Sequence, residues 1–361
     1  MSRRSLFRRK AGRKRQAGLL VLSLLVGFLA VEIAARVWYG PLPESLTDWS
    51  SIVLRSRTAV VPPALVADPT VGWAGAPNVK GDGVTHDARG FRIVPNRPIP
   101  GGASSPIVAA GDSFTYGAEV RDDESWPFYL QEMVGRRVIN SGMPGYGLDQ
   151  SVLRAEQLVK EFKPSLLIVS FIPDDLIRSE MSRAWQREKP WFELQGSELK
   201  LRNVPVPPNA AAGSHVPFWE RWIGWSVVVN TLRNHLVKEQ ELYFGDHLRA
   251  MPAGDGEKVA CALVQRLAGL KVPTLVVAQY SPIDWKRLHT GGKPPRNVSR
   301  EVLECAAKGG LETLDLFDPL ERVIAAKGIT SVYAPMSEHH NPGGNRFAAE
   351  QIAAKIATMK N

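Results

Sequence analysis

Cysteine is scarce in this sequence: only Cys261 and Cys305 occur among its 361 residues. They form neither a Cys-x-x-Cys pair nor a cluster with metal-ligand spacing, so redox chemistry, a metal site and a cofactor are not expected. The two cysteines fall on separate predicted helices that flank one predicted strand and could be neighbours on one side of a sheet. Two separate buried thiols are the favoured expectation, and a disulfide is the alternative.

Acidic residues are missing from the N-terminus. Residues 1–16 contain no Asp or Glu and eight Lys and Arg, which account for all but one of the formal net charge of +9. The rest of the chain is therefore nearly neutral and has no evident phosphate-binding face. Nucleic acid is not an expected partner.

A long apolar run follows this basic segment, over residues 17–35, interrupted only by Glu32. About 19 residues suffice to cross the ~30 Å hydrocarbon layer, and basic residues before a span keep the N-terminus in the cytoplasm. We expect a basic cytoplasmic tail over 1–16 and a transmembrane anchor over 17–38. A cleaved signal peptide is the alternative, but no good Ala-x-Ala site precedes Glu32. Either way, the bulk of the chain is expected to be periplasmic or extracellular, and the anchor would hold it at the inner membrane by a single pass.

The rest of the chain is interpreted as a stalk over residues 39–66 and one folded domain over 67–361, of which 67–105 show little periodicity. Within the domain, short apolar runs alternate with amphipathic segments, which predicts an α/β fold with a parallel sheet and helices on both faces. The predicted strands are 106–111, 136–140, 165–172, 273–279 and 311–315. The predicted helices are 124–134, 148–162, 255–269, 298–308 and 343–358.

An insertion at about 178–250 interrupts the alternation. Residues 189–194 and 198–201 predict a hairpin around a glycine turn. The insertion also holds half of the ten tryptophans, which could form a lid or an aromatic platform, although core packing is the favoured interpretation. These tryptophans are Trp185, Trp191, Trp219, Trp222 and Trp225.

The segment Ile107-Val-Ala-Ala-Gly-Asp-Ser-Phe-Thr-Tyr-Gly117 places a serine at the end of a short apolar run. It predicts a buried strand that brings Ser113 to the carboxyl edge of the sheet, where ligands and catalytic groups of α/β sheets collect. A serine at such a strand-to-helix turn is exposed, and adjacent backbone N–H groups can bind an oxyanion. The alternative is a glycine-rich turn with a capping serine.

Three further segments follow in a recognisable order. Val138-Ile-Asn-Ser-Gly142 ends another apolar run, Leu166-Leu-Ile-Val-Ser-Phe-Ile-Pro-Asp-Asp175 ends in two acids, and Ser337-Glu-His-His-Asn-Pro-Gly-Gly-Asn345 precedes an amphipathic helix. In this order of Ser, Gly, polar residue and His, the chain resembles the SGNH (GDSL-type) hydrolases from about residue 65 to the end.

The resemblance is closer to the membrane-anchored bacterial members of that superfamily. Their Leu-Gly-Tyr and Gly-Phe-Arg preamble corresponds here to Val71-Gly-Trp73 and Gly90-Phe-Arg92. The resemblance implies a three-layer, flavodoxin-like domain.

The same resemblance implies a Ser–His mechanism. Ser113 would be the nucleophile, and His339 the base, because the spacing of His339, Asn341 and Gly344 matches the last block while His340 would lose it. The oxyanion donors would be the N–H groups of Ser113 and Gly142 and a side chain at Asp174.

Two departures from the family pattern stand out. Asp174 replaces an amide donor, and an ionised carboxylate only accepts hydrogen bonds, so its donor role stays open. Family members commonly place an Asp two or three residues before the His, where this chain has Ser337 and Met336. Glu338, Asp315 and Asp318 are the candidate acids, and a Ser–His dyad without an acid is a further alternative.

These inferences predict a serine esterase that acts on acyl or acetyl esters, with a cell-envelope polymer or glycan as the substrate suggested by location and family analogy. Two alternatives remain. One is a non-catalytic envelope module that binds glycan or lipid. The other is an O-acyltransferase that works with a separate acyl-supplying membrane partner.

Overall fold

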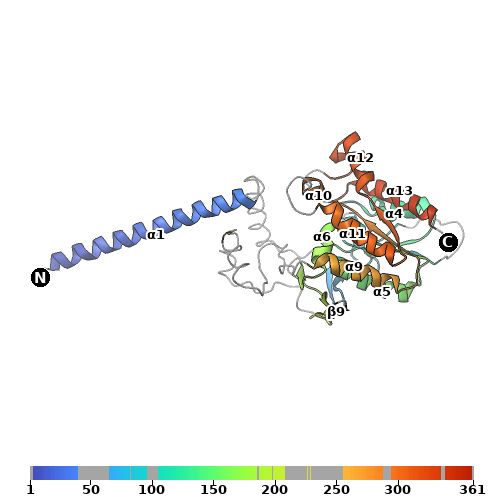
Figure 1. Cartoon of the computed structure of the whole chain (residues 1–361), viewed down its shortest axis with the longest axis horizontal. Coiled ribbons are helices and arrows are strands. Elements are labelled where there is room, and N and C mark those ends of the chain that lie inside the picture. The colour runs from blue at the N-terminus through green and yellow to red at the C-terminus, as the bar shows by residue number, and fades with distance from the viewer. Residues whose placement is uncertain are drawn as a thin grey trace. The chain divides into compact units, whose positions relative to one another are not determined.

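The computed structural model divides the chain into two compact units. The first takes Met1–Ala59 and His215–Gly245, and the second takes Val60–Ser214 and Asp246–Asn361. Figure 1 shows the long helix of the first unit and the α/β body of the second. The residues described are 3–39, 65–81, 83–95, 105–184, 187–196, 198–207, 226, 228, 255–287, 294–334 and 338–359.

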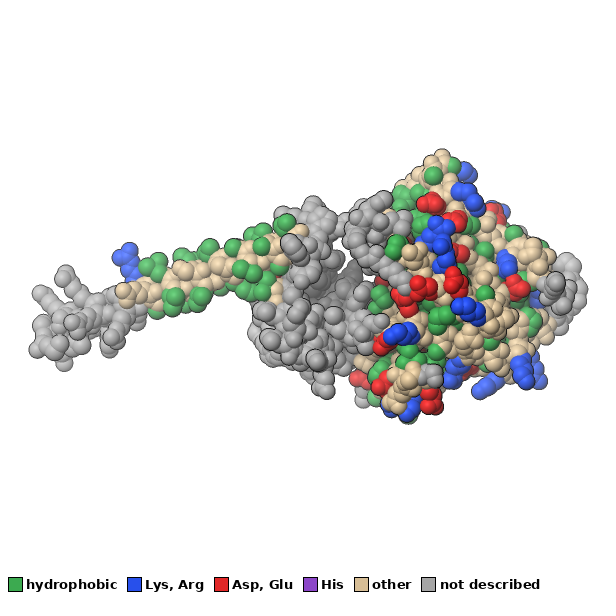
Figure 2. All heavy atoms as spheres, in the orientation of Figure 1, with side chains coloured by type: hydrophobic (Ala, Val, Ile, Leu, Met, Phe, Trp, Pro, Cys, Tyr) green, Lys and Arg blue, Asp and Glu red, His purple; other side chains and the backbone are tan. Residues whose placement is uncertain are grey.

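The first unit contains helix α1 (Arg3–Tyr39). Its stretch Arg15–Ala35 spans 21 residues with a mean hydropathy of 2.4, which is long and apolar enough to cross a membrane. Figure 2 shows hydrophobic side chains along this part of the helix. Glu32 is buried within this unit and accepts hydrogen bonds from Ser226 Oγ at 2.7 Å and from the N–H of Val228 at 3.2 Å.

The second unit is built on a five-stranded sheet in which every pairing is parallel. The predicted strands are confirmed, each within two residues of its expected bounds. In chain order, numbered one to five, they lie side by side as two, one, three, four, five, which is the flavodoxin-like order. Across the sheet they are β4 (Val138–Asn140), β3 (Ile107–Ala110), β5 (Leu166–Phe171), β10 (Thr274–Ala278) and β11 (Glu312–Asp315).

Helices cover both faces of this sheet, because its apolar strands must be shielded from water on each side. Helix α4 packs against α13, while α9 packs against both α5 and α11 (Figure 1). The five predicted helices are confirmed as α4 (Trp126–Val134), α5 (Leu148–Phe162), α9 (Gly256–Ala268), α11 (Pro295–Lys308) and α13 (Pro342–Thr358).

Several elements were not expected, and all but the 11-residue α12 are at most two helical turns or two residues of strand, which leave little periodicity to detect. They are α3 (Ser113–Tyr116), α6 (Pro173–Arg178), α10 (Pro282–Arg287), α12 (Phe317–Lys327), the 3-10 turns η1 (Asp122–Glu124) and η3 (Ile329–Ser331), and the pair β6 (Arg183–Ala184) and β7 (Arg187–Glu188).

Besides the short β6–β7 pair, two longer hairpins lie outside the main sheet among the described residues. The pair β8 (Trp191–Gln195) and β9 (Glu198–Arg202) confirms the hairpin expected there, and Gly196 takes a left-handed φ of 65° at its turn. The pair β1 (Leu65–Asp68) and β2 (Gly72–Gly75) corrects the expectation of little regular structure in that region. Of the tryptophans in the insertion, Trp185, Trp219, Trp222 and Trp225 lie outside the described residues.

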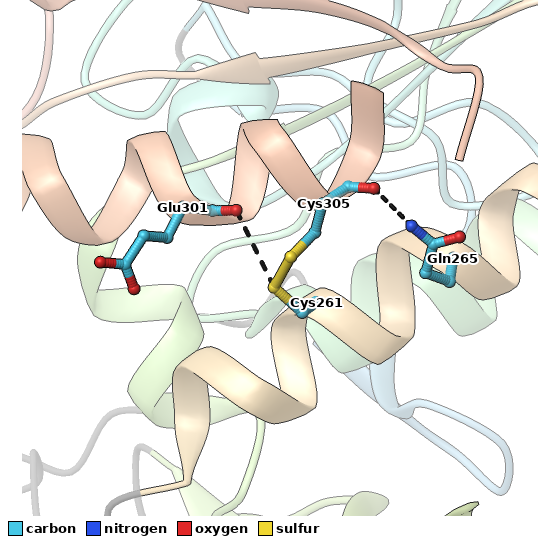
Figure 3. Close-up of a disulfide and its surroundings, with 4 residues drawn as sticks. All are labelled: Cys261, Gln265, Glu301 and Cys305. Carbon is cyan, nitrogen blue, oxygen red and sulfur yellow. Dashed lines mark hydrogen bonds between the residues drawn. A yellow bond between two sulfur atoms is a disulfide. The ribbon is translucent and has the colours of Figure 1, made fainter. Parts of the chain in front are cut away.

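The expectation of two separate thiols is wrong. Cys261 on α9 and Cys305 on α11 form a disulfide, with their Cα atoms 5.3 Å apart (Figure 3). Both residues are half-buried rather than buried. The bond forms because α9 and α11 pack side by side, so that their facing turns bring the two sulfur atoms together.

Candidate active site

Ser113 stands at the carboxyl edge of the sheet. Strand β3 ends at Ala110, and α3 begins at Ser113 after a two-residue turn. Asp112 caps α3 by accepting a hydrogen bond from the N–H of Phe114 at 2.9 Å. A side chain at Gly111 would collide with Thr115, so the tight turn requires glycine. The serine is therefore held at the first position of α3, where its N–H has no acceptor among the described residues.

His339 lies against this serine. Its Nε2 is 2.8 Å from Ser113 Oγ, although the two residues are 226 positions apart in the chain. The loop that carries it is fastened at the start of α13, where Asn341 Oδ1 accepts a hydrogen bond from the N–H of Gly344 at 2.9 Å. An imidazole at this distance can take the serine proton.

His340 is in a different environment. Its ring is buried between Phe114 and Tyr333, each with its ring centre 5.0 Å away, and neither ring nitrogen has a hydrogen-bond partner among the described residues. Burial lowers the pKa of His340 to about 3, with a smaller contribution from His339. The structure thus brings His339, and not His340, to Ser113.

A carboxylate that the sequence did not single out completes the group. Glu119 Oε1 lies 3.1 Å from His339 Nδ1, on the side of the ring away from Ser113. Glu119 belongs to the loop after α3 and adopts a left-handed φ of 67°. A carboxylate at this nitrogen holds the tautomer in which Nε2 is free to accept a proton.

The acids expected from the sequence make other contacts or face solvent. Asp315 accepts hydrogen bonds from the Tyr280 hydroxyl and from the N–H of Phe317, both at 2.9 Å. Asp318 pairs with Arg296. Glu338 is exposed, and the hydrogen bond of His339 Nδ1 goes to Glu119. Glu119 follows the serine in the sequence and carries no motif of its own, so no pattern in the sequence pointed to it.

Gly142 is brought to the site by β4. A side chain there would collide with the backbone of Thr115 and Tyr116, so only glycine allows this loop to pack on α3. Its N–H, however, donates to Asn140 Oδ1 at 3.1 Å. This expected oxyanion donor is therefore engaged, and an oxyanion would have to compete with the Asn140 amide oxygen for it.

Asp174 follows β5 on α6, at the same edge of the sheet. Its Oδ2 lies 3.8 Å from Arg178 Nη2, and Arg178 Nη1 lies 2.5 Å from the buried Asp175. A carboxylate paired with a guanidinium is stabilised as the anion, which only accepts hydrogen bonds, so this geometry gives no support to a donor role for Asp174.

Two other carboxyls near Ser113 are fully buried. Burial raises the pKa of Asp112 and, together with the charge of Asp112, raises the pKa of Asp175 well above its usual value. In the part of the chain that the structure describes, no group of three or more His, Cys, Asp or Glu residues could hold a metal ion.

No protein-family model matches the sequence, and no curated protein matches it. Solved structures do. The psychrotrophic esterase EstA from Pseudoalteromonas sp. is 13% identical, with 70% of this chain and 97% of that chain covered and a TM-score of 0.39. A catalytic mutant of Axe2, an acetylxylan esterase from Geobacillus stearothermophilus, is 14% identical, with 72% and 96% covered and a TM-score of 0.41.

A third similar structure is LAE5, an alpha/beta hydrolase enzyme from the metagenome of Lake Arreo, Spain. It is 14% identical, with 73% of this chain and 100% of that chain covered and a TM-score of 0.42. Identities this low do not carry an activity from one protein to another. The functional proposal therefore depends on this chain's own residues.

Proposed function

We propose that this protein is a serine esterase that acts on acyl or acetyl esters, with Ser113 as nucleophile, His339 as base and Glu119 as the group that orients the imidazole. The observation that carries the proposal is the hydrogen bond of 2.8 Å between Ser113 Oγ and His339 Nε2. The carboxylate on the opposite ring nitrogen adds support, because nucleophile, base and orienting acid form the arrangement that activates a serine.

The first half of the reaction forms an acyl-enzyme. Ser113 Oγ attacks the ester carbonyl carbon while its proton passes to His339 Nε2. The resulting imidazolium is stabilised by Glu119, to which Nδ1–H donates. As the tetrahedral intermediate collapses, the bond to the alcohol oxygen breaks and His339 returns the proton to the leaving alcohol.

The second half releases the acid. A water molecule gives a proton to His339 Nε2 and attacks the acyl carbon, and Ser113 leaves with that proton. In both halves the oxyanion forms beside the free N–H of Ser113 at the start of α3. The N–H of Gly142 would join only by exchanging Asn140 Oδ1 for the oxyanion.

The proposal places the catalytic unit outside the cytoplasm, on a single-pass anchor with its N-terminus inside. The apolar span Arg15–Ala35 supports the anchor, and the basic residues before it support that orientation. The disulfide between Cys261 and Cys305 supports export, since such bonds persist in oxidising compartments. An ester of an envelope polymer or glycan is the substrate that this location favours.

The test is to solubilise the full-length protein in detergent and treat it with a fluorescent fluorophosphonate, which labels only activated serines. Ser113→Ala and His339→Ala should lose the label. Ser165→Ala is the matched control, because Ser165 precedes β5 at the opposite edge of the sheet, and it should label like the wild type.

Label retained in Ser113→Ala would refute this mechanism. If the folded wild type and Ser165→Ala are both unlabelled, the glycan- or lipid-binding module becomes the better description. Labelling without release of free acid from a simple ester such as p-nitrophenyl acetate would favour an acyltransferase that needs its membrane partner.

A further inference from the structure

Arg92, from the preamble that precedes the sheet, is buried beneath the loop that carries Glu119. The side chain has no exposed surface. Its guanidinium makes four hydrogen bonds, all to the last residue of α3 and the segment that follows it. Nη1 donates to the carbonyls of Tyr116 and Gly117, Nη2 donates to the Val120 carbonyl at 2.5 Å, and Nε donates to Asp122 Oδ1 at 3.0 Å.

The backbone of the 116–122 segment requires this stabilisation. Its carbonyls on either side of Glu119 converge on one cation, which forces the backbone between them to turn back sharply. Glu119 lies in that turn with a φ of 67°, a left-handed conformation that is unfavourable for a residue with a side chain. Hydrogen bonds from a charged donor are stronger than neutral ones and can offset this cost. Asn140 Nδ2 adds a further bond, to the Tyr116 carbonyl at 3.2 Å.

The side chain of Glu119 cannot supply this positioning by itself. It is 47% exposed, and a half-exposed carboxylate gains little from an ion pair while it loses rotamer freedom. Its distance of 3.1 Å to His339 Nδ1 therefore depends on where the backbone of the loop is held.

We propose that Arg92 is a positioning residue for catalysis: it clamps the 116–122 segment so that Glu119 meets His339. This role rests on the proposed esterase function and extends it. It also gives the Gly90-Phe-Arg92 segment a task in the reaction, although Arg92 touches neither Ser113 nor His339 in the described hydrogen bonds.

A double-mutant cycle on the full-length protein in detergent tests this role. The readout is the second-order rate constant for fluorophosphonate labelling of Ser113, measured over about pH 5 to 9. The variants are Arg92→Lys, Glu119→Gln and the double variant. Lysine keeps the charge but not the planar fork that reaches several carbonyls at once. Arg89→Lys is the control, since Arg89 belongs to the same preamble as Arg92 but its side chain is half-exposed.

We expect Arg92→Lys and Glu119→Gln each to lower the rate constant about 10- to 100-fold, and the double variant to be no slower than Glu119→Gln, because groups that act as one unit are not additive. In both single variants the pH profile of labelling should change in the same way, because each removes or displaces the carboxylate that contacts His339 Nδ1. A purely structural role would lower the rate constant without changing the shape of the profile. Arg89→Lys should match the wild type.

Additive losses, or a wild-type rate and profile in Arg92→Lys, would overturn the positioning role while leaving the esterase intact. Label retained in Ser113→Ala would instead overturn the esterase assignment and this role together. Should Arg92→Lys fail to fold, Asp122→Asn provides a milder variant, because it leaves the three carbonyl contacts of Arg92 in place and weakens the acceptor shared by Arg92 Nε and the N–H of Thr85. It must then show the same lack of additivity with Glu119→Gln and the same change in pH profile, or the role is refuted.

Discussion

The carboxylate of Glu119 lies 3.1 Å from Nδ1 of His339, although 220 positions separate the two residues in the chain. This contact joins the loop after the serine to the loop before the last helix. It connects two distant parts of the domain's sequence beside Ser113, and it makes Glu119 the first acidic residue to test.

Replacing Glu119 by Gln removes the charge and preserves the shape, so the rate of fluorophosphonate labelling should fall about 10- to 100-fold without a loss of fold. Glu338→Gln is the matched control, because Glu338 adjoins His339 in the sequence yet does not take its Nδ1 hydrogen bond. The rate for Glu338→Gln should equal that of the wild type. If Glu338→Gln is the slower of the two, Glu338 is the acid.

Asp174→Asn should make the enzyme faster. The change replaces an acceptor by an amide that can donate to the oxyanion, and a single donor of this kind is worth about 100-fold or more when well placed, so a gain of about tenfold in kcat for p-nitrophenyl acetate is expected. Asp318→Asn, which removes a carboxylate paired with Arg296, should leave kcat unchanged. A drop in kcat for Asp174→Asn would mean that the Asp174–Arg178 ion pair is needed as it stands.

His340 should make the protein less stable in mild acid. Burial lowers its pKa from 6.5 to about 3, so between these values the unfolded chain binds a proton that the folded chain does not. The free energy of unfolding therefore decreases as the pH falls, by about 2 kcal/mol from pH 7 to pH 5 from this group alone.

His340→Phe isolates this effect, because it keeps an aromatic ring between Phe114 and Tyr333 and removes ring nitrogens that make no hydrogen bond among the described residues. Urea unfolding followed by circular dichroism at pH 7 and pH 5 should show that the variant loses about 2 kcal/mol less than the wild type. Equal losses in both proteins would show that His340 is protonated in the folded state.

The disulfide should contribute to stability because it closes a long loop. Cys261 and Cys305 are 44 residues apart, and closing a loop of that length stabilises a fold by about 4 kcal/mol in the chain-entropy estimate. Urea unfolding with and without a reductant measures this difference. The double variant Cys261→Ser/Cys305→Ser should unfold like the reduced wild type and show no effect of reductant.

The oxidation state of Cys261 and Cys305 in the cell indicates the compartment in which the domain lies. Protein extracted from membranes under alkylating conditions should carry no free thiol until it is reduced, as expected for an exported domain. Alkylation of both cysteines before reduction would contradict the disulfide in the cell and the proposed export together.

Much of the fold could be predicted from the sequence because it depends on local patterns. Short apolar runs such as 107–110 and 166–171 have the length of buried strands, and the amphipathic segments between them have one apolar face with which to cover a sheet. The choice of His339 over His340 came from the resemblance to the SGNH hydrolases, whose last block has the spacing of His339, Asn341 and Gly344.

Other features were decided only by the tertiary structure. Glu119 reaches His339, Cys261 reaches Cys305, and the Gly142 N–H turns to Asn140. The sequence by itself determined which segments form the five strands of the main sheet and their covering helices, because apolar runs and periodicity are local properties. It also indicated that Ser113 follows a strand and that His339 precedes a helix. Which distant side chains meet depends on strand order, helix packing and the path of each loop, so the partner of the histidine could be identified only once the chain was folded.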